Sequence, residues 1–163
     1  MAVPTGRYGR ATIGAREKPK RELTDRYGGG MQVPPNCDLT LGMVCVDKTT
    51  PGLTVWTMRG DERFANPAGV IQGGFVAAMC DSAMGASSVT FVAGRKVFSA
   101  NAEMKVSFLR PAIVGSLLTC TARVVSGGKT VVFVEAEVVD DAGRMVARAS
   151  STYVVSPRDS GSA

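Results

Sequence analysis

The sequence contains no histidine, and this absence narrows its possible chemistry more than any residue that is present. Without an imidazole there can be no Ser-His-Asp or Cys-His nucleophile, no histidine metal ligand and no histidine general base. If the chain is an enzyme, proton transfer must therefore fall to Asp, Glu, Lys, Tyr or Cys side chains.

The four cysteines form no recognisable framework. They are Cys37, Cys45, Cys80 and Cys120. No two are arranged as C-x-x-C, and their spacing is neither that of a zinc ribbon nor that of a disulfide-rich domain. We interpret them as small buried apolar side chains, in a protein of a reducing, cytoplasmic compartment.

Long apolar runs are also missing. No segment approaches the roughly 18 uncharged apolar residues that span a bilayer, and we see no apolar signal-peptide core. We therefore expect no membrane partner. The 163 residues, 45% of them hydrophobic, fit one folded domain with terminal extensions.

Positive charge is concentrated near the N-terminus. Residues 1–36 hold seven Lys and Arg against three Asp and Glu, whereas the rest of the chain holds twelve against eleven. The Gly- and Pro-rich composition of 1–36 predicts a basic arm with a short helix near 21–27. A solvated arm is favoured over a nucleic-acid contact, because no aromatic stacking pattern accompanies the charges.

The remaining chain alternates between strand-like and helix-like patterns. Two strands are expected at 41–47 and 52–59, followed by one helix from 74 to about 92. From 97 onward apolar and polar residues alternate, as in VVFVEAEVV at 131–139, which is typical of an antiparallel meander with one polar face. We predict an α+β domain at 37–157 with a short tail at 158–163. The helix is apolar enough to need cover on most sides.

One carboxylate interrupts the expected helix. Between Arg63 and Arg95 the single charged residue is Asp81, and its neighbours are small or apolar. Burying a carboxylate without a partner is costly. Either a hydrogen-bond partner compensates Asp81 or the residue serves a function.

Three stretches match one family in order, spacing and turn placement. They are FANPAGVIQGGFVAAMCDSAMG, AEMKVSFLRPA and SGGKTVVFVEAEVVDDAGRMVARASSTYVV, and together they cover about 38–156. They resemble the hotdog-fold acyl-CoA thioesterases of the PaaI-like group, in the 4-hydroxybenzoyl-CoA thioesterase superfamily. The resemblance implies an antiparallel sheet wrapped around one long central helix, and hydrolysis of an acyl- or aryl-CoA to a carboxylic acid and free CoA. It implies no metal or redox cofactor.

The family motif is Asn-x-x-Gly-x-x-His-Gly-Gly, followed about two helical turns later by an acid. The matching residues here are Asn66, Gly69, Gly73, Gly74 and Asp81, with Gln72 in the position of the usual His. The resemblance makes Asp81 the nucleophile or the general base for water. Asn66 and Gln72 would orient water or the thioester carbonyl through their amides.

The residues themselves support these roles. Gly73 and Gly74 open the expected helix, where backbone N–H groups are free donors at the positive end of the helix dipole. We expect the Gly73 N–H, helped by Gly74, to stabilise the oxyanion. A simple tight turn into the helix is the structural alternative. Asn101, on the strand after the helix, is a further candidate for binding water.

The resemblance also implies assembly. In the family the acid meets the oxyanion donor across a subunit interface, so we expect a homodimer, commonly paired again into a tetramer. Coenzyme A carries phosphates that basic residues could contact. The candidates, each with an ordinary solvated charge as the alternative, are Arg95, Lys96, Arg110 and Lys129.

The acyl group is not specified by the sequence. We expect the size of its pocket to depend on packing around a set of large apolar residues, namely Phe75, Met79, Met84, Phe91 and Phe98.

Other functions stay open. A hotdog protein that binds acyl-CoA without hydrolysing it is the main alternative, because Gln72 departs from the usual His. A hotdog hydratase or dehydratase typically uses a catalytic His, which this chain lacks. Nucleic-acid binding by residues 1–36 would show a steep salt dependence. We expect no nucleic-acid partner.

Overall fold

A computed structural model describes residues 34–157 of the chain. Its elements, in order, are α2 (Asn36–Leu41), β1 (Val44–Asp47), β2 (Leu53–Arg59), the 3-10 helix η1 (Glu62–Phe64), α3 (Gly73–Phe91), β3 (Val97–Phe108), β4 (Leu117–Gly127), β5 (Val131–Val139) and β6 (Met145–Pro157). Most of the arm expected at 1–36, with its helix near 21–27, lies outside the described residues. So does the tail expected at 158–163.

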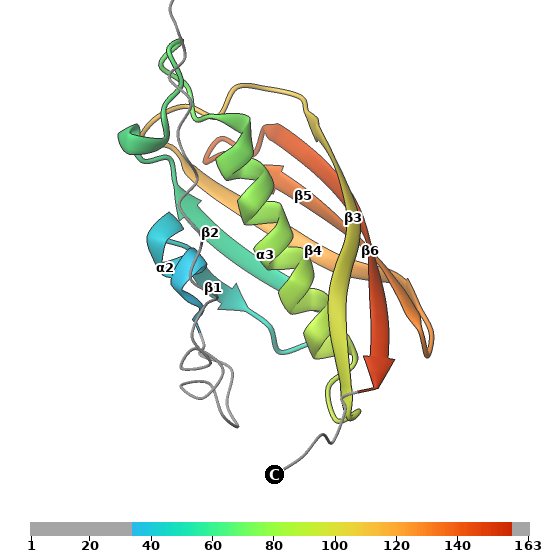
Figure 1. Cartoon of the computed structure of the whole chain (residues 1–163). Coiled ribbons are helices and arrows are strands. Elements are labelled where there is room, and N and C mark those ends of the chain that lie inside the picture. The colour runs from blue at the N-terminus through green and yellow to red at the C-terminus, as the bar shows by residue number, and fades with distance from the viewer. Residues whose placement is uncertain (1–33, 158–163) are drawn as a thin grey trace, which may run out of the picture. The chain divides into compact units, whose positions relative to one another are not determined.

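The six strands form one antiparallel sheet in the order β1-β2-β4-β5-β6-β3. The sheet curves around α3, which lies along one of its faces, and β1 and β3 form its two edges (Figure 1). The α+β hotdog architecture expected from the sequence is therefore confirmed, as is a single long helix within one or two residues of its expected bounds.

Strand pairing departs from a simple meander at one point. Strands β4, β5 and β6 pair in sequence, but β3 pairs with β6 and not with β4. The alternating pattern identifies each strand and its faces. It does not identify neighbours, because these depend on contacts between distant parts of the chain.

The strand expected at 41–47 is wrong at its beginning. Residues 36–41 form α2, which carries Asp38 in its first turn, and β1 begins only at Val44. Gly42 follows the helix with a φ of 66°, a left-handed conformation that ends helices and favours glycine. Leu41 and Met43 are apolar and both are buried. Two apolar residues in this spacing fit the end of a helix as well as a strand, so the pattern did not distinguish the two.

Helix α3 packs on the sheet through both apolar and hydroxyl side chains. Met79, Ala83 and Met84 are fully buried. Ser87 Oγ lies 2.6 Å from the Gly52 carbonyl oxygen and 3.0 Å from that of Ala122. These bonds satisfy a hydroxyl that would otherwise be costly to bury, and they fix the position of the helix against β2 and β4.

All four cysteines are free thiols. Cys80 and Cys120 are buried, as expected, and Cys45 is partly buried. The prediction is wrong for Cys37, which lies exposed on the short helix α2.

Candidate active site

The approach to α3 is a tightly bonded loop. Asn66 Oδ1 accepts hydrogen bonds from the N–H groups of Ala68, at 2.9 Å, and Val70, at 3.4 Å. Gly69 has a φ of 75°, which a residue with a side chain rarely adopts. Asn66 is therefore a turn former whose side-chain oxygen is engaged, and only its amide N–H groups are left for a substrate.

Gln72 is the residue that precedes the helix. Its N–H donates to the Phe64 carbonyl oxygen and its own carbonyl accepts from the Phe75 N–H, at 2.8 and 2.9 Å. The rings of Phe64 and Phe75 stack with their centroids 4.2 Å apart, which holds the first turn of α3 to η1. The Gln72 side chain is exposed and makes no capping hydrogen bond. Its amide can therefore face a ligand.

The first two N–H groups of α3 are available as donors. Gly73 and Gly74 begin the helix, so no carbonyl one turn earlier in the helix can accept from them. Within the described part of the chain, neither N–H has an acceptor among the backbone bonds outside the helix. This arrangement can stabilise negative charge on a substrate oxygen.

An apolar cavity of about 360 Å³ opens beside Gly73. A Cβ at Gly73 would lie 3.0 Å from Phe108 Cζ, whereas a Cβ at Gly74 would meet nothing within 4 Å. The residues that line the cavity with Gly73 include Ile71, Val76, Phe108 and Arg110. An apolar group of a substrate could thus lie next to the free N–H groups.

Asp81 lies two helical turns further along α3 and is exposed in the single chain. It has a partner: Asn101 Nδ2 donates to Asp81 Oδ1 at 2.7 Å. At a rise of about 1.5 Å per residue, Asp81 is roughly 12 Å along the helix from Gly73. One chain therefore does not bring its carboxylate to its own free N–H groups.

A β-bulge places Asn101 against the helix. Asn101 pairs with Tyr153 and Glu103 pairs with Thr152, which leaves Ala102 as an extra residue in β3. Bulges redirect side chains and are frequent beside active sites. The expected site residues Asp81 and Asn101 are therefore brought together by the pairing of β3 with β6.

Two residues of β6 that the sequence analysis missed belong to this cluster. Ser151 is buried, and its Oγ lies 2.7 Å from Asn101 Oδ1. Tyr153 is also buried and its hydroxyl donates to the Asp81 carbonyl oxygen at 3.4 Å. Burial, together with the charge of Asp81, raises the pKa of Tyr153, so the phenol stays protonated and remains a donor. The sequence signal that could have identified these two residues is the presence of polar residues at alternate positions of β6 that face inward.

The candidate basic residues separate into two groups. Arg110 lines the cavity beside Gly73, and its Nη1 donates to the Met145 carbonyl oxygen at 3.1 Å. Arg95 instead follows the C-terminal end of α3 and donates to the carbonyl oxygens of Gly128 and Lys129. Within one chain, Arg95, Lys96 and Lys129 thus lie a helix length away from Gly73.

None of the residues expected to shape the acyl pocket lines the cavity beside Gly73 in the single chain. Met79 and Met84 are fully buried in the core, and Phe98 is exposed near the start of β3. Phe91 packs near Gly127, where a Cβ would lie 2.4 Å from the ring. The wall of the cavity at Gly73 is formed by Phe108 and its neighbours instead.

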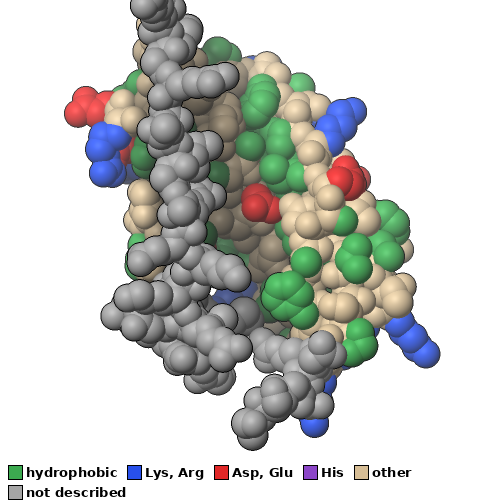
Figure 2. Space-filling view, in the orientation of Figure 1, with side chains coloured by type: hydrophobic (Ala, Val, Ile, Leu, Met, Phe, Trp, Pro, Cys, Tyr) green, Lys and Arg blue, Asp and Glu red, His purple; other side chains and the backbone are tan. Residues whose placement is uncertain are grey.

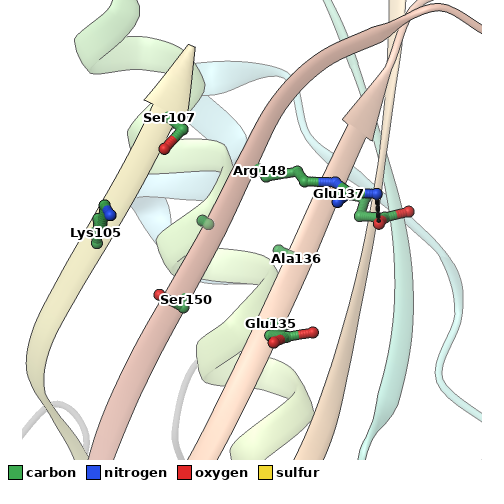
Figure 3. A pocket seen from close by; sticks show the side chains of 8 residues that line it. Lys105, Ser107, Glu135, Ala136, Glu137, Arg148 and Ser150 are labelled. Carbon is green, nitrogen blue, oxygen red and sulfur yellow. Dashed lines mark ion pairs between the residues drawn. The ribbon is translucent and has the colours of Figure 1, made fainter. Parts of the chain in front are cut away.

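A second hollow, of about 210 Å³, lies on the opposite face of the sheet. Its strands contribute Lys105 and Arg148 as well as Glu135 and Glu137, and Arg148 Nη2 lies 2.8 Å from Glu137 Oε1 (Figure 3). None of the predicted site residues lines it. Its balanced charges are those of the polar outer face predicted from the sequence.

The face that carries α3 is different in character. Charged side chains are few on its visible described surface, where apolar side chains alternate with backbone and uncharged polar groups, and an acidic side chain lies near the middle (Figure 2). Among the described helices, none is long and apolar enough to cross a membrane.

Comparisons with known proteins agree on one family, the thioesterases. Residues 68–147 match the family model described as the thioesterase superfamily. The chain is 25% identical to acyl-coenzyme A thioesterase 13 of Homo sapiens over 118 residues, which is 72% of this chain and 83% of the human protein.

Solved structures have the same fold. The PaaI protein of the E. coli phenylacetic acid degradation operon matches with a TM-score of 0.66 and 24% identity, over 72% of this chain and 86% of PaaI. A protein of Streptococcus mutans, solved bound to acetyl CoA, matches with a TM-score of 0.67 and 21% identity, over 78% of this chain and 94% of the other.

Proposed function

Because this chain belongs to the thioesterase superfamily as a PaaI-like hotdog protein, it is a thioesterase, and we propose that it uses Asp81 to hydrolyse an acyl- or aryl-CoA thioester. The products would be a carboxylic acid and free CoA. The observation that carries this proposal is that one helix holds two complementary groups. These are a lone carboxylate bonded to Asn101 and, at the start of the helix, two glycine N–H groups without acceptors.

The substrate class follows from the relatives and from the cavity. Thioesterase 13 acts, by its name, on acyl-coenzyme A, and the S. mutans protein was solved with acetyl CoA. In this chain the apolar cavity at Gly73 would take an apolar portion of the substrate, and Arg110 at its wall could contact a CoA phosphate. The positions of Arg95, Lys96 and Lys129 make them candidates only for a site completed by another chain.

The oxyanion would form at the start of α3. When a nucleophile adds to the thioester carbonyl carbon, negative charge develops on the carbonyl oxygen. The Gly73 N–H, helped by that of Gly74, would donate to this oxygen, and the amides of Gln72 and Asn66 would orient the carbonyl or the water. Collapse of the adduct expels the CoA thiolate, which takes up a proton.

Asp81 would supply the nucleophile in one of two ways. It either accepts the proton of a water that attacks the carbonyl, or attacks with its own oxygen to form an anhydride that water then opens. A single turnover in isotopically labelled water tests for the anhydride. Label in the Asp81 side chain indicates an anhydride that water opens at the Asp81 carboxyl carbon. Label in the acid product alone is expected both for direct attack by water and for an anhydride that water opens at the acyl carbon.

The site is complete only with a second chain. Asp81 and Gly73 of one chain are roughly 12 Å apart along α3, too far to act on one carbonyl. Among the described strands, β3 pairs only with β6, so its other edge is free to pair with a second copy. We propose a homodimer in which Asp81 of one chain serves Gly73 of the other, with a dimer of dimers as the larger assembly.

Release of free CoA thiol from a panel of aryl and aliphatic acyl-CoAs tests the function. We expect turnover by the native chain, and a fall in kcat of about 10²–10⁴ in Asp81→Asn, because that is the usual contribution of a general base. Retained activity in Asp81→Asn would exclude this role. Tight CoA binding with no turnover by the native chain would instead favour a protein that only binds acyl-CoA. This alternative is tested because Gln72 stands in the position of the usual His.

A further inference from the structure

We propose that Ser151 is a positioning residue that anchors Asn101, so that the Asn101 amide holds Asp81 in place for catalysis. This inference rests on the function proposed for Asp81. It concerns a residue with no place in the glycine-rich motif, on the last strand of the sheet.

The first step is the burial of Ser151. Its side chain lies at an inward position of β6 and the residue is only 3% exposed. Its Oγ lies 2.7 Å from Asn101 Oδ1 and 2.7 Å from the Glu103 carbonyl oxygen. A hydroxyl in such a place is fixed between two acceptors on β3, one on each side of the bulge.

The second step is the geometry of Asn101. One end of its amide meets Ser151 and the other donates to Asp81 Oδ1, so the side chain bridges β6 and α3. A side-chain amide bonded at one end only can rotate or turn over, because its oxygen and nitrogen ends have nearly the same shape. Ser151 removes this freedom.

The third step is the consequence for Asp81. Asn101 engages Oδ1, and among the side-chain bonds of the described residues none involves Asp81 Oδ2. One carboxylate oxygen is thus held while the other is left to meet water or substrate. Tyr153, two residues after Ser151, donates to the Asp81 backbone carbonyl and holds the same residue from the same strand.

A double-mutant cycle in the full-length chain tests the anchor. We expect Ser151→Ala to lower kcat about tenfold with KM nearly unchanged, because the bond that anchors Asn101 Oδ1 is lost and Asp81 is then less well aligned. Ser151→Thr, which keeps the hydroxyl, should restore most of the loss. In an Asn101→Ala background, Ser151→Ala should cause no further fall, because its effect passes through Asn101.

Ser87→Ala provides the matched control. Ser87 is also a fully buried serine bonded to carbonyl oxygens, but it lies in the C-terminal half of α3. The Ser87→Ala variant should have a lower melting temperature than the native chain but the same kcat. A fall in kcat for Ser151→Ala no larger than that for Ser87→Ala, or an equal fall with and without Asn101, would overturn the proposal.

A measurement that does not depend on turnover keeps the two proposals separate. The side-chain amide NMR signals of Asn101, identified by their loss in Asn101→Ala, should shift in Asp81→Ala and move toward solvent-exposed values in Ser151→Ala. Unchanged signals in Ser151→Ala would refute the anchor even if the chain hydrolyses CoA esters. Changed signals in a chain without turnover would leave the anchor standing and reject the function.

Discussion

At the scale of the residue, the charge of Asp81 is accommodated by exposure and by one short hydrogen bond. Asn101 Nδ2 donates to its carboxylate at 2.7 Å, and the Tyr153 hydroxyl donates to its backbone carbonyl. In the proposed mechanism the complementary group is the free Gly73 N–H at the start of the helix, which would stabilise the oxyanion. Both groups sit on regular secondary structure, which holds them more rigidly than a loop would.

The role of Gly73 can be tested by removing its N–H alone. Gln72 has φ −58° and ψ 131°, an extended conformation that a following proline requires, and proline is tolerated at the first position of a helix. We expect Gly73→Pro to lower kcat by about 10²–10³, the usual effect of losing an oxyanion donor.

Gly73→Ala is the control for that experiment. It adds the same Cβ near Phe108 but keeps the N–H, and Phe108 is 54% exposed and can move aside. Its kcat should stay within a few fold of the native value. Equal losses in Gly73→Ala and Gly73→Pro would show that crowding by the side chain, and not the missing donor, is responsible.

The sequence predicts these residues unevenly. Asp81, Gly73 and Asn66 belong to a motif with fixed spacing, so they could be identified from the sequence. Ser151 and Tyr153 join the site only because β6 pairs with β3, a pairing that no local pattern predicts.

At the scale of the element, the bulge in β3 connects the fold to the site. If Ala102 were absent and β3 alternated regularly, every later residue of the strand would lie on the opposite face of the sheet. With the bulge, Asn101 contacts α3 and Phe108 still reaches the cavity beside Gly73. The sequence alternation predicted both faces of β5 correctly but gave no sign of the bulge.

The turn between β5 and β6 provides a pH-dependent test of stability. Asp140 Oδ1 accepts from the N–H groups of Ala142 and Arg144, and Oδ2 lies 2.8 Å from Arg144 Nη2. These bonds lower the pKa of Asp140 from its ordinary value of 3.8. A lowered pKa stabilises the fold above 3.8, and this stabilisation is lost as the pH falls through the pKa of the folded state.

We therefore expect Asp140→Asn to lower the melting temperature at neutral pH, and the difference from the native chain to shrink below about pH 4. Thermal unfolding followed by circular dichroism at several pH values measures this. A difference that is constant with pH would mean that the charge of Asp140 does not stabilise the turn.

At the scale of the whole molecule, the two groups proposed for catalysis, Asp81 and the Gly73 N–H, do not meet within one chain. The sequence predicted both groups and, through the family resemblance, their meeting across a subunit interface. The structure of a single chain adds the distance argument and the free edge of β3. We expect light scattering to give a homodimer or a tetramer. A monomer with full activity would contradict the shared site.

Mixing two inactive variants tests the central claim most directly. Asp81→Asn and Gly73→Pro chains are unfolded together, refolded and assayed for CoA release. In a hybrid dimer one site has two native partners and the other has none, so random pairing should restore about a quarter of the native activity. If Asp81 and Gly73 of the same chain worked together, the mixture would be as inactive as its two components.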